Sequence, residues 1–365
     1  MSTEPLIGYS HLHATGVRTF NLLISFSEGA NHAVEEIYKG ITLTVIKSNI
    51  SQGDLESLTT FRNEVLSSLL SHPHTASAYV IGTGEEPIPL YTIIGELLAI
   101  NSATEYLSIN NGSDEAMAVK IAIAGATDLS TQSLPGLREI DTPKVILGYE
   151  VEPKILPDLV TQADIFGITL DVRKFSADPY ADLRNWMLEG THVVISFIPS
   201  HLYPVGTLLT PVINVASDSE FHNSFIGDFD ITSTDSPERI IEEVLGVFSR
   251  VRTFSEYTRT TLPVMTLPLQ QPDQSKNVQL VIANEALNTL ATDIAHHFEN
   301  VDYLGFVSDW KLLPESRGLL IALTTGSPAE LEQLESAPTD AQVMNLSEVG
   351  SLGALAEAAA RFISS

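Results

Sequence analysis

Short apolar runs alternate with longer amphipathic segments along most of the chain, which is the pattern of strands connected by helices. Phe20–Phe26 and Ile41–Ile46 are strand-like, and the segment between them, which opens at Glu28, has a helical pattern. Asp54 is placed to cap a following helix whose apolar side chains, up to Leu70, lie on one face. This order of elements predicts a parallel, doubly wound sheet.

The alternation continues after Thr142. Strands are expected at Lys144–Tyr149, Ile168–Val172 and His192–Ile198. A helix that begins at Ser236, with Asp235 or Ser236 as its N-cap, closes this part of the chain. The second part therefore has the same predicted construction as the first.

Thr260–Gln274 contains three prolines and has no clear period, so we interpret it as a linker. A further set of strands and helices begins at Val278. We expect an α/β protein with two doubly wound parallel-sheet lobes, at residues 1–126 and 143–258, and a small C-terminal α/β domain at 275–365. The sequence reveals no internal repeat.

Ser71–Glu86, SHPHTASAYVIGTGEE, combines a His-Pro break, a buried strand and a Gly-x-Gly turn. Gly82 and Gly84 allow a sharp turn at the carboxyl end of the strand, which is where ligands bind in open α/β sheets. The turn lacks the third glycine of a dinucleotide fingerprint, and Glu85 and Glu86 would repel a phosphate. These carboxylates are expected to bind a cation, to polarise a hydroxyl, or simply to be solvated.

The chain carries 46 acidic and 19 basic residues, for a formal net charge of −27. This charge would repel nucleic acid and anionic membranes, and no basic stripe offsets it, so neither is expected as a partner. The charge is typical either of a solvated acidic surface or of a protein from a salt-rich cytoplasm. No apolar run approaches the roughly 18 residues of a membrane span and no signal peptide is visible, so we expect a cytoplasmic location.

The absence of cysteine excludes disulfides, thiolate metal ligands, iron–sulfur clusters and cysteine nucleophiles. The ten histidines include the close pairs His11 with His13, His72 with His74, and His296 with His297. Such spacing is a weaker metal signal than ligands three or four residues apart on a helix. A structural or solvated role is the alternative for each pair.

Three separated blocks of the chain follow one family pattern in order. His72-Pro-His and Gly82-Thr-Gly-Glu-Glu match H-P-N and G-L-G-C-E, and Gly16, Arg18 and Asn31 match an N-terminal G-x-R-N and C-x-N pattern. Phe197–Pro211 follows F-T-T-G-R-G-S-x-x-G-x-x-P-x-P, Ala216-Ser-Asp follows A-T-N, and Asp228-Phe-Asp follows D-M-D. The chain therefore resembles the altronate/galactarate dehydratase (UxaA-type) family over about residues 7–250.

The resemblance implies a carbon–oxygen lyase that removes water from a sugar acid, with a divalent metal, iron in the family, as cofactor. It also implies a small carboxylic or sugar acid as substrate, and a homo-oligomer. Carried over to this chain, the catalytic positions are Glu85, Glu86 and His201, and the metal-binding positions are His72 and Glu85. The substrate-binding positions are Arg18, Asn31, Gly82, Gly84, Asp228 and Asp230.

The chain departs from the family at its reactive positions. Gly29 and Glu85 stand where the family has cysteines, and His201 and Asn214 stand where it has arginine and lysine. One hypothesis is a non-catalytic homologue that uses the scaffold for binding or assembly. Another is an active lyase on a hydroxy-acid, with a Glu/His/Asp site for a hard cation. A third places an interaction function in the C-terminal domain.

Overall fold

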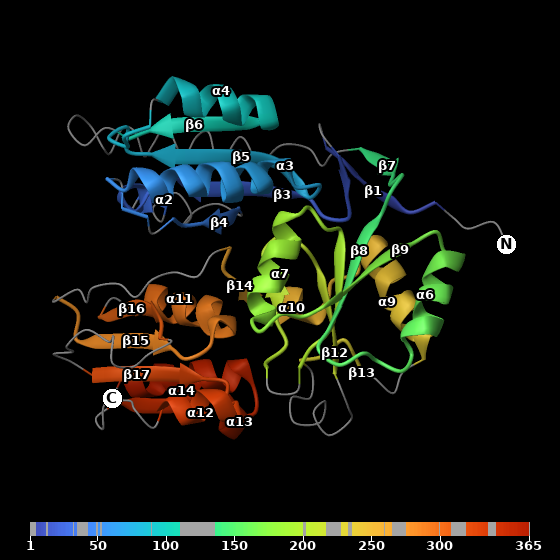
Figure 1. Ribbon diagram of the computed structural model, residues 1–365. Coiled ribbons are helices and arrows are strands. Elements are labelled where there is room, and N and C mark those ends of the chain that lie inside the picture. The colour runs from blue at the N-terminus through green and yellow to red at the C-terminus, as the bar shows by residue number, and fades with distance from the viewer. Residues whose placement is uncertain are drawn as a thin grey trace.

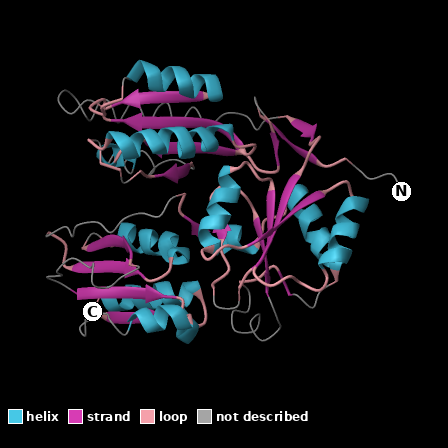
Figure 2. Cartoon of the chain, viewed as in Figure 1, coloured by secondary structure: helices cyan, strands magenta, loops and turns pink. Residues whose placement is uncertain are grey.

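In the computed structural model of the protein, the described residues are 5–11, 14–31, 33–34, 43–48, 50–51, 53–88, 90–109, 136–199, 202–216, 228–232, 236–258, 260–264, 275–298, 300–307, 319–334 and 341–364. They form a mixed α/β structure with three parallel sheets, each in its own lobe (Figure 1). Figure 2 shows helices lying beside the strands of every lobe. The predicted α/β fold class is confirmed.

The first lobe spans residues 20–109. Its parallel sheet has the strand order β4-β3-β5-β6. The strands are β3 (Phe20–Ser25), β4 (Thr44–Ile46), β5 (Thr75–Gly82) and β6 (Thr104–Ser108). The helices are η1 (Glu28–Ala30), α2 (Leu55–Thr60), the π-helical η2 (Phe61–Leu66), α3 (Ser67–Ser71) and α4 (Leu90–Ile100).

The middle lobe has the sheet order β13-β12-β10-β8-β9. Its strands are β8 (Lys144–Tyr149), β9 (Thr169–Lys174), β10 (Val193–Phe197), β12 (Val212–Ala216) and β13 (Ile231–Thr232). Its helices are α6 (Leu156–Ile165), α7 (Pro179–Leu188), α9 (Pro237–Phe248) and α10 (Phe254–Thr258). Short strands β11 (Gly206–Thr207) and β14 (Thr261–Leu262) pair in parallel beside it.

The third lobe has the sheet order β16-β15-β17-β18. Its strands are β15 (Val278–Ile282), β16 (Val301–Phe306), β17 (Leu319–Thr324) and β18 (Gln342–Asn345). Its helices are η3 (Glu285–Leu287), α11 (Asn288–His297), α12 (Pro328–Leu334), α13 (Leu346–Val349) and α14 (Leu352–Ile363).

The three lobes share one strand order. Numbered along the chain within each lobe, the strands lie in the order 2-1-3-4 in the first and third lobes and 2-1-3-4-5 in the middle lobe. In this doubly wound arrangement, the order reverses between strands 1 and 3, and ligands bind at the carboxyl ends of those strands. The repeated topology is a feature that the sequence does not reveal.

Local sequence explains why these elements begin where they do. Asp54 Oδ1 accepts a hydrogen bond of 3.1 Å from the backbone N–H of Ser57, and Ser236 Oγ accepts one of 3.3 Å from that of Arg239. Both side chains satisfy a backbone donor in the first turn of a helix. The predicted cap at Asp54 is confirmed. Of the two candidates for the later helix, Ser236 is the cap, and Asp235 lies outside the described residues.

The central strands of the middle sheet, β8, β10 and β12, are buried on both faces. One face, which includes Val145 and Ile195, packs under α6 and α9. The other face includes Ile146 and Val194 and belongs to an apolar cluster that extends into the third lobe, where it includes Leu280. Near-continuous apolar strands of this kind are typical of parallel sheets covered on both sides.

Two predicted domain boundaries need correction. β1 (Ile7–Ser10), β2 (Thr15–Gly16) and β7 (Leu137–Glu139) form a small antiparallel sheet, and Val17 packs into the core of the middle lobe. The first lobe therefore starts near residue 20 and not at the N-terminus. At the start of the predicted linker, β14 pairs with β11, and residues 265–274 of that linker lie outside the described residues. None of the helices in the described part of the chain has the length and apolar character of a membrane span.

Candidate functional site

The turn that follows β5 is closed by the carboxylate of Glu86. Its Oε1 accepts hydrogen bonds from the Ser27 hydroxyl at 2.8 Å and from the backbone N–H of Thr83 at 2.7 Å, and its Oε2 accepts one from the Gly84 N–H at 2.8 Å. Glu86 is 8% exposed. We call residues 82–86, together with Ser27, the Glu86 turn. It lies at the carboxyl ends of β3 and β5, where the strand order reverses.

Steric constraints explain why both of these positions in the turn are glycine. Gly84 has φ +78°, which an L side chain rarely adopts. A Cβ atom on Gly82 would come within 1.9 Å of the Tyr106 hydroxyl and 3.2 Å of Glu86 Oε1. Gly82 and Gly84, predicted to bind substrate, here allow the chain to wrap around its own carboxylate.

The Glu86 carboxylate is held as an anion. Burial alone raises the pKa of Glu86, but the hydrogen bonds from Thr83 and Ser27 outweigh it and lower the pKa below its ordinary value. Burial and the Glu86 charge raise the pKa of the Tyr106 hydroxyl, which therefore stays neutral. A general base works best with a pKa near the operating pH. Glu86 has the properties of a fixed structural charge.

Two other predicted residues share this edge of the first lobe. Asn31 Oδ1 accepts a 2.5 Å hydrogen bond from the Ser25 hydroxyl, and Ser25 in turn accepts one of 2.7 Å from the backbone of Ser48. Glu85 is exposed, and its backbone N–H donates to Thr83 Oγ1 at 3.2 Å. The structure thus brings Asn31 and Glu85 to the same edge as the Glu86 turn.

Arg18 lies elsewhere and uses all five of its N–H donors within the protein. Nε and Nη2 pair with the two carboxylate oxygens of Glu256 at 2.7 and 2.8 Å. Its other N–H groups donate to the carbonyls of Val17, Val247 and Val251 at 3.2, 3.1 and 2.6 Å. The guanidinium therefore ties the segment before β3 to the end of α9 and to α10.

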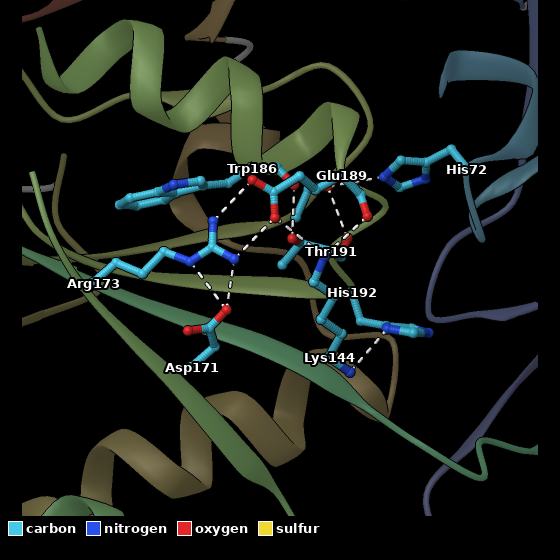
Figure 3. Close-up of polar contacts among 9 residues, drawn as sticks. His72, Lys144, Asp171, Arg173, Trp186, Glu189, Thr191 and His192 are labelled. Atoms are coloured by element: carbon cyan, nitrogen blue, oxygen red, sulfur yellow. Dashed lines mark hydrogen bonds and ion pairs between the residues drawn. The ribbon is translucent and has the colours of Figure 1, made fainter. Parts of the chain in front are cut away.

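His72 lies where the first lobe meets the middle lobe (Figure 3). Its Nε2 is 3.1 Å from the Thr210 hydroxyl, which donates to the carbonyl of Thr191 at 2.9 Å. Its Nδ1 accepts the backbone N–H of His74 at 3.1 Å. Both ring nitrogens of His72 are thus engaged by the protein.

His74 and His192 complete a group that we call the junction histidines, together with His72. His74 Nδ1 is 2.8 Å from the carbonyl of Leu209, and His192 Nδ1 accepts the backbone N–H of Lys144 at 3.1 Å. The ring centroids of His72 and His74 are 4.8 Å apart, and those of His74 and His192 are 5.9 Å apart. Burial lowers the pKa of His72 to about 3 and also lowers the pKa of the other two. All three rings are neutral at neutral pH.

The junction joins the amino ends of two sheets. β5 begins one residue after His74, and β8 and β10 begin at Lys144 and next to His192. The carboxyl ends of both sheets therefore point away from the junction. β5 alone extends about 23 Å at 3.3 Å per residue. This corrects the predicted metal pair, because His72 precedes β5 while Glu85 follows its far end, so they cannot hold one ion.

Two predicted substrate-binding residues, Asp228 and Asp230, lie in the middle lobe, where Asp230 directly precedes β13. Asp230 accepts backbone hydrogen bonds from Asn214 at 2.8 Å and Phe254 at 2.7 Å. Burial raises the pKa of Asp230 to about 7. Burial also raises the pKa of Asp228, which hydrogen-bonds with Tyr203. His201 lies outside the described residues.

Sequence reasoning missed two residues that complete these contacts, Ser27 and Glu256. Ser27 stands before Glu28 at the start of η1, where a serine is expected to cap, yet its hydroxyl bonds Glu86 across the edge. Glu256 is 238 residues from Arg18 and carries no local signal. Among the described residues, no group of three or more His, Asp or Glu side chains is arranged to hold a metal ion.

No protein-family model and no curated protein matches the chain. Among solved structures, a crystal structure of yeast Rtt107 and Slx4 aligns over 94% of this chain and 72% of that chain. The two share 16% sequence identity at a TM-score of 0.17. A TM-score this low carries no argument about fold or function.

Proposed function

We propose that the protein is a non-catalytic homologue of the dehydratase type, which uses its α/β lobes for binding or assembly. The observation that carries this proposal is the separation of the residues that the resemblance assigns to one centre. Glu86 follows the far end of β5, and His72 and Arg18 lie near the junction of the first two lobes. Asp230 lies in the middle lobe, directly before β13 and beside the carboxyl end of β12.

The chemistry of elimination explains why this separation matters. Removal of water beside a carboxylate needs a base, a group that stabilises the leaving hydroxyl, and cations for the acid, all within reach of one substrate. Here the N–H groups of Arg18 donate to Glu256 and to backbone carbonyls. The carboxylate oxygens of Glu86 accept hydrogen bonds from the backbone N–H groups of its own turn. Both contacts support a structural role for groups that a lyase would aim at its substrate.

Metal and ligand analysis of the purified full chain tests the proposal. We expect sub-stoichiometric iron and manganese after purification and no lyase activity that depends on them. Light scattering coupled to size-exclusion chromatography reports the assembly state that a scaffold role requires. Stoichiometric metal, with activity lost on chelation, would contradict the proposal and favour the alternative of a lyase with a hard-cation site.

A further inference from the structure

The third lobe repeats the construction of the first at the level of individual residues. In each lobe, strand 1 runs directly into a short 3-10 helix, η1 or η3. The segments Ser27-Glu-Gly-Ala-Asn31 and Asn284-Glu-Ala-Leu-Asn288 share glutamate and asparagine at equal spacing. Ser27 and Asn284 are therefore equivalent, since each occupies the N-cap position of its helix.

The loop after β17 holds a carboxylate as the Glu86 turn does. Glu330 Oε1 accepts hydrogen bonds from Asn284 Nδ2, Thr325 Oγ1 and Ser327 Oγ at 2.7, 2.6 and 2.8 Å. Its Oε2 accepts bonds from Thr324 Oγ1 at 2.5 Å and from the Thr325 N–H at 2.7 Å. Glu330 is 6% exposed. Five donors thus converge on one buried carboxylate.

The two loops hold their glutamates with equivalent hydrogen-bond donors and an equivalent glycine. In both, the residue at the N-cap position of the 3-10 helix donates a side-chain hydrogen bond to Oε1 of the glutamate. In both, the backbone N–H of a threonine after strand 3 donates to the glutamate. The next residue is a glycine in the left-handed region, with φ +78° at Gly84 and +85° at Gly326. The loops differ in length, because Glu86 comes three residues after Thr83 and Glu330 five after Thr325.

We propose that these two edges are copies of one oxyanion-binding cradle, in which a glutamate of the chain occupies the place of a small free carboxylate or phosphate. The donors are backbone N–H, hydroxyl and amide groups fixed by the ends of strands 1 and 3, the position at which doubly wound sheets bind ligands. A carboxylate and a phosphate present similar oxygen acceptors to such donors. Once the tethered carboxylate is removed, the cradle is free for a small oxyanion.

Covalent attachment explains why the glutamate side chain occupies the cradle in preference to a free anion. A side chain joined to the loop acts at a high effective concentration, so it outcompetes a dilute free anion. The net charge of −27 further disfavours free anions near the protein. The glutamate therefore keeps both cradles filled in the native chain.

The cradle in the first lobe is the better one from which to remove the glutamate. In the third lobe, Glu285 of η3 makes a buried ion pair with Arg184 of the middle lobe, so this edge also carries an interlobe contact. The equivalent residue in the first lobe, Glu28, is exposed. Glu86→Ala removes the tethered carboxylate, and Glu28→Ala is a matched control that removes one charge from the same edge.

Thermal unfolding with added anions tests the cradle. We expect Glu86→Ala to lower Tm by on the order of 5 °C in chloride. Sodium acetate or inorganic phosphate at about 100 mM should restore part of this loss relative to chloride at equal ionic strength. Rescue by acetate alone identifies a carboxylate cradle, and rescue by phosphate alone a phosphate cradle. The Glu28→Ala variant and the native chain should show no anion-specific shift.

A second variant keeps the test decisive if Glu86→Ala does not fold. Glu86→Gln preserves the side-chain volume but turns an NH₂ group toward N–H donors. We expect it to lose more stability than Glu28→Gln and to gain nothing from acetate, because the amide still fills the cradle. Equal stability of the two glutamine variants would overturn the proposal. So would a folded Glu86→Ala protein whose Tm responds to acetate and phosphate as it does to chloride.

Discussion

The ion pair between Arg184 and Glu285 joins the middle and third lobes, and its removal is expected to be costly. Arg184 Nη1 lies 2.7 Å from Glu285 Oε2, and the two side chains are 10% and 8% exposed. Arg184 belongs to α7 and Glu285 to η3, so the contact fixes the third lobe against the middle sheet.

The size of the effect follows from burial. Truncating one partner leaves the other charge buried without compensation, which costs about 3–5 kcal/mol. We expect a loss in this range for Glu285→Ala. Replacing both residues by apolar ones, as in Arg184→Met with Glu285→Leu, removes both desolvation penalties and should cost far less. Glu285 Oε1 has no hydrogen-bond partner within the described residues, which makes the native pair incompletely satisfied.

Urea denaturation followed by circular dichroism measures these free energies of unfolding. The matched control is the pair between Arg361 and Glu357 on α14, which are both 78% exposed and 3.7 Å apart. Glu357→Ala should change the free energy of unfolding by less than about 1 kcal/mol. The reasoning is refuted if Glu285→Ala is no more destabilising than Glu357→Ala, or if the double apolar variant is as unstable as Glu285→Ala.

Three other predictions can be checked with the same denaturation assay. Arg18→Lys keeps the charge but loses two of five donors and the fork geometry, so we expect a loss of at least about 2 kcal/mol. The junction histidines have lowered pKa values, so the unfolded chain binds protons that the folded chain does not. The free energy of unfolding should then be at its full value above about pH 6.5 and should fall as the pH drops toward 3. In His72→Gln it should fall less steeply, and an equal slope in that variant would count against a lowered pKa of His72. Gly148→Ala places a Cβ 2.5 Å from the Trp186 ring and should cost about 1–3 kcal/mol, whereas Gly353→Ala in α14 meets no atom within 4 Å and should stabilise by up to about 1 kcal/mol.

Much of the fold could be predicted because its signals are local. The strand predicted at Lys144–Tyr149 coincides with β8, and the predicted caps at Asp54 and Ser236 both accept a backbone hydrogen bond. Apolar runs of strand length and polar caps depend on residues a few positions apart, which the sequence displays directly.

The arrangement of the candidate site could not be predicted because it depends on distant pairs. The sequence places Glu86 and Asp230 in two different lobes, but it does not say which ends of the two sheets meet. The amino ends meet at the junction histidines, so Glu86 and Asp230 both lie away from the junction, each in its own lobe. The partner of Arg18 is likewise 238 residues away.

The role of Glu86 was missed for a different reason. A carboxylate after a Gly-x-Gly turn looks available for a ligand, and only the turn geometry reveals that it satisfies the N–H groups of Thr83 and Gly84. The internal repeat was also hidden, since the equivalent cradles differ in loop length and share only a few residues. Strand order and hydrogen bonding make the equivalence visible.

A product assay on the purified full chain tests the proposed function most directly. The protein, supplied with Fe²⁺ or Mn²⁺, is incubated with a panel of aldonic and aldaric acids, and the mixtures are analysed for 2-keto-3-deoxy acids. The separation of Glu86, Arg18 and Asp230 predicts no product above that of the same acid and metal without protein. A 2-keto-3-deoxy product that requires the protein and disappears on chelation would contradict it.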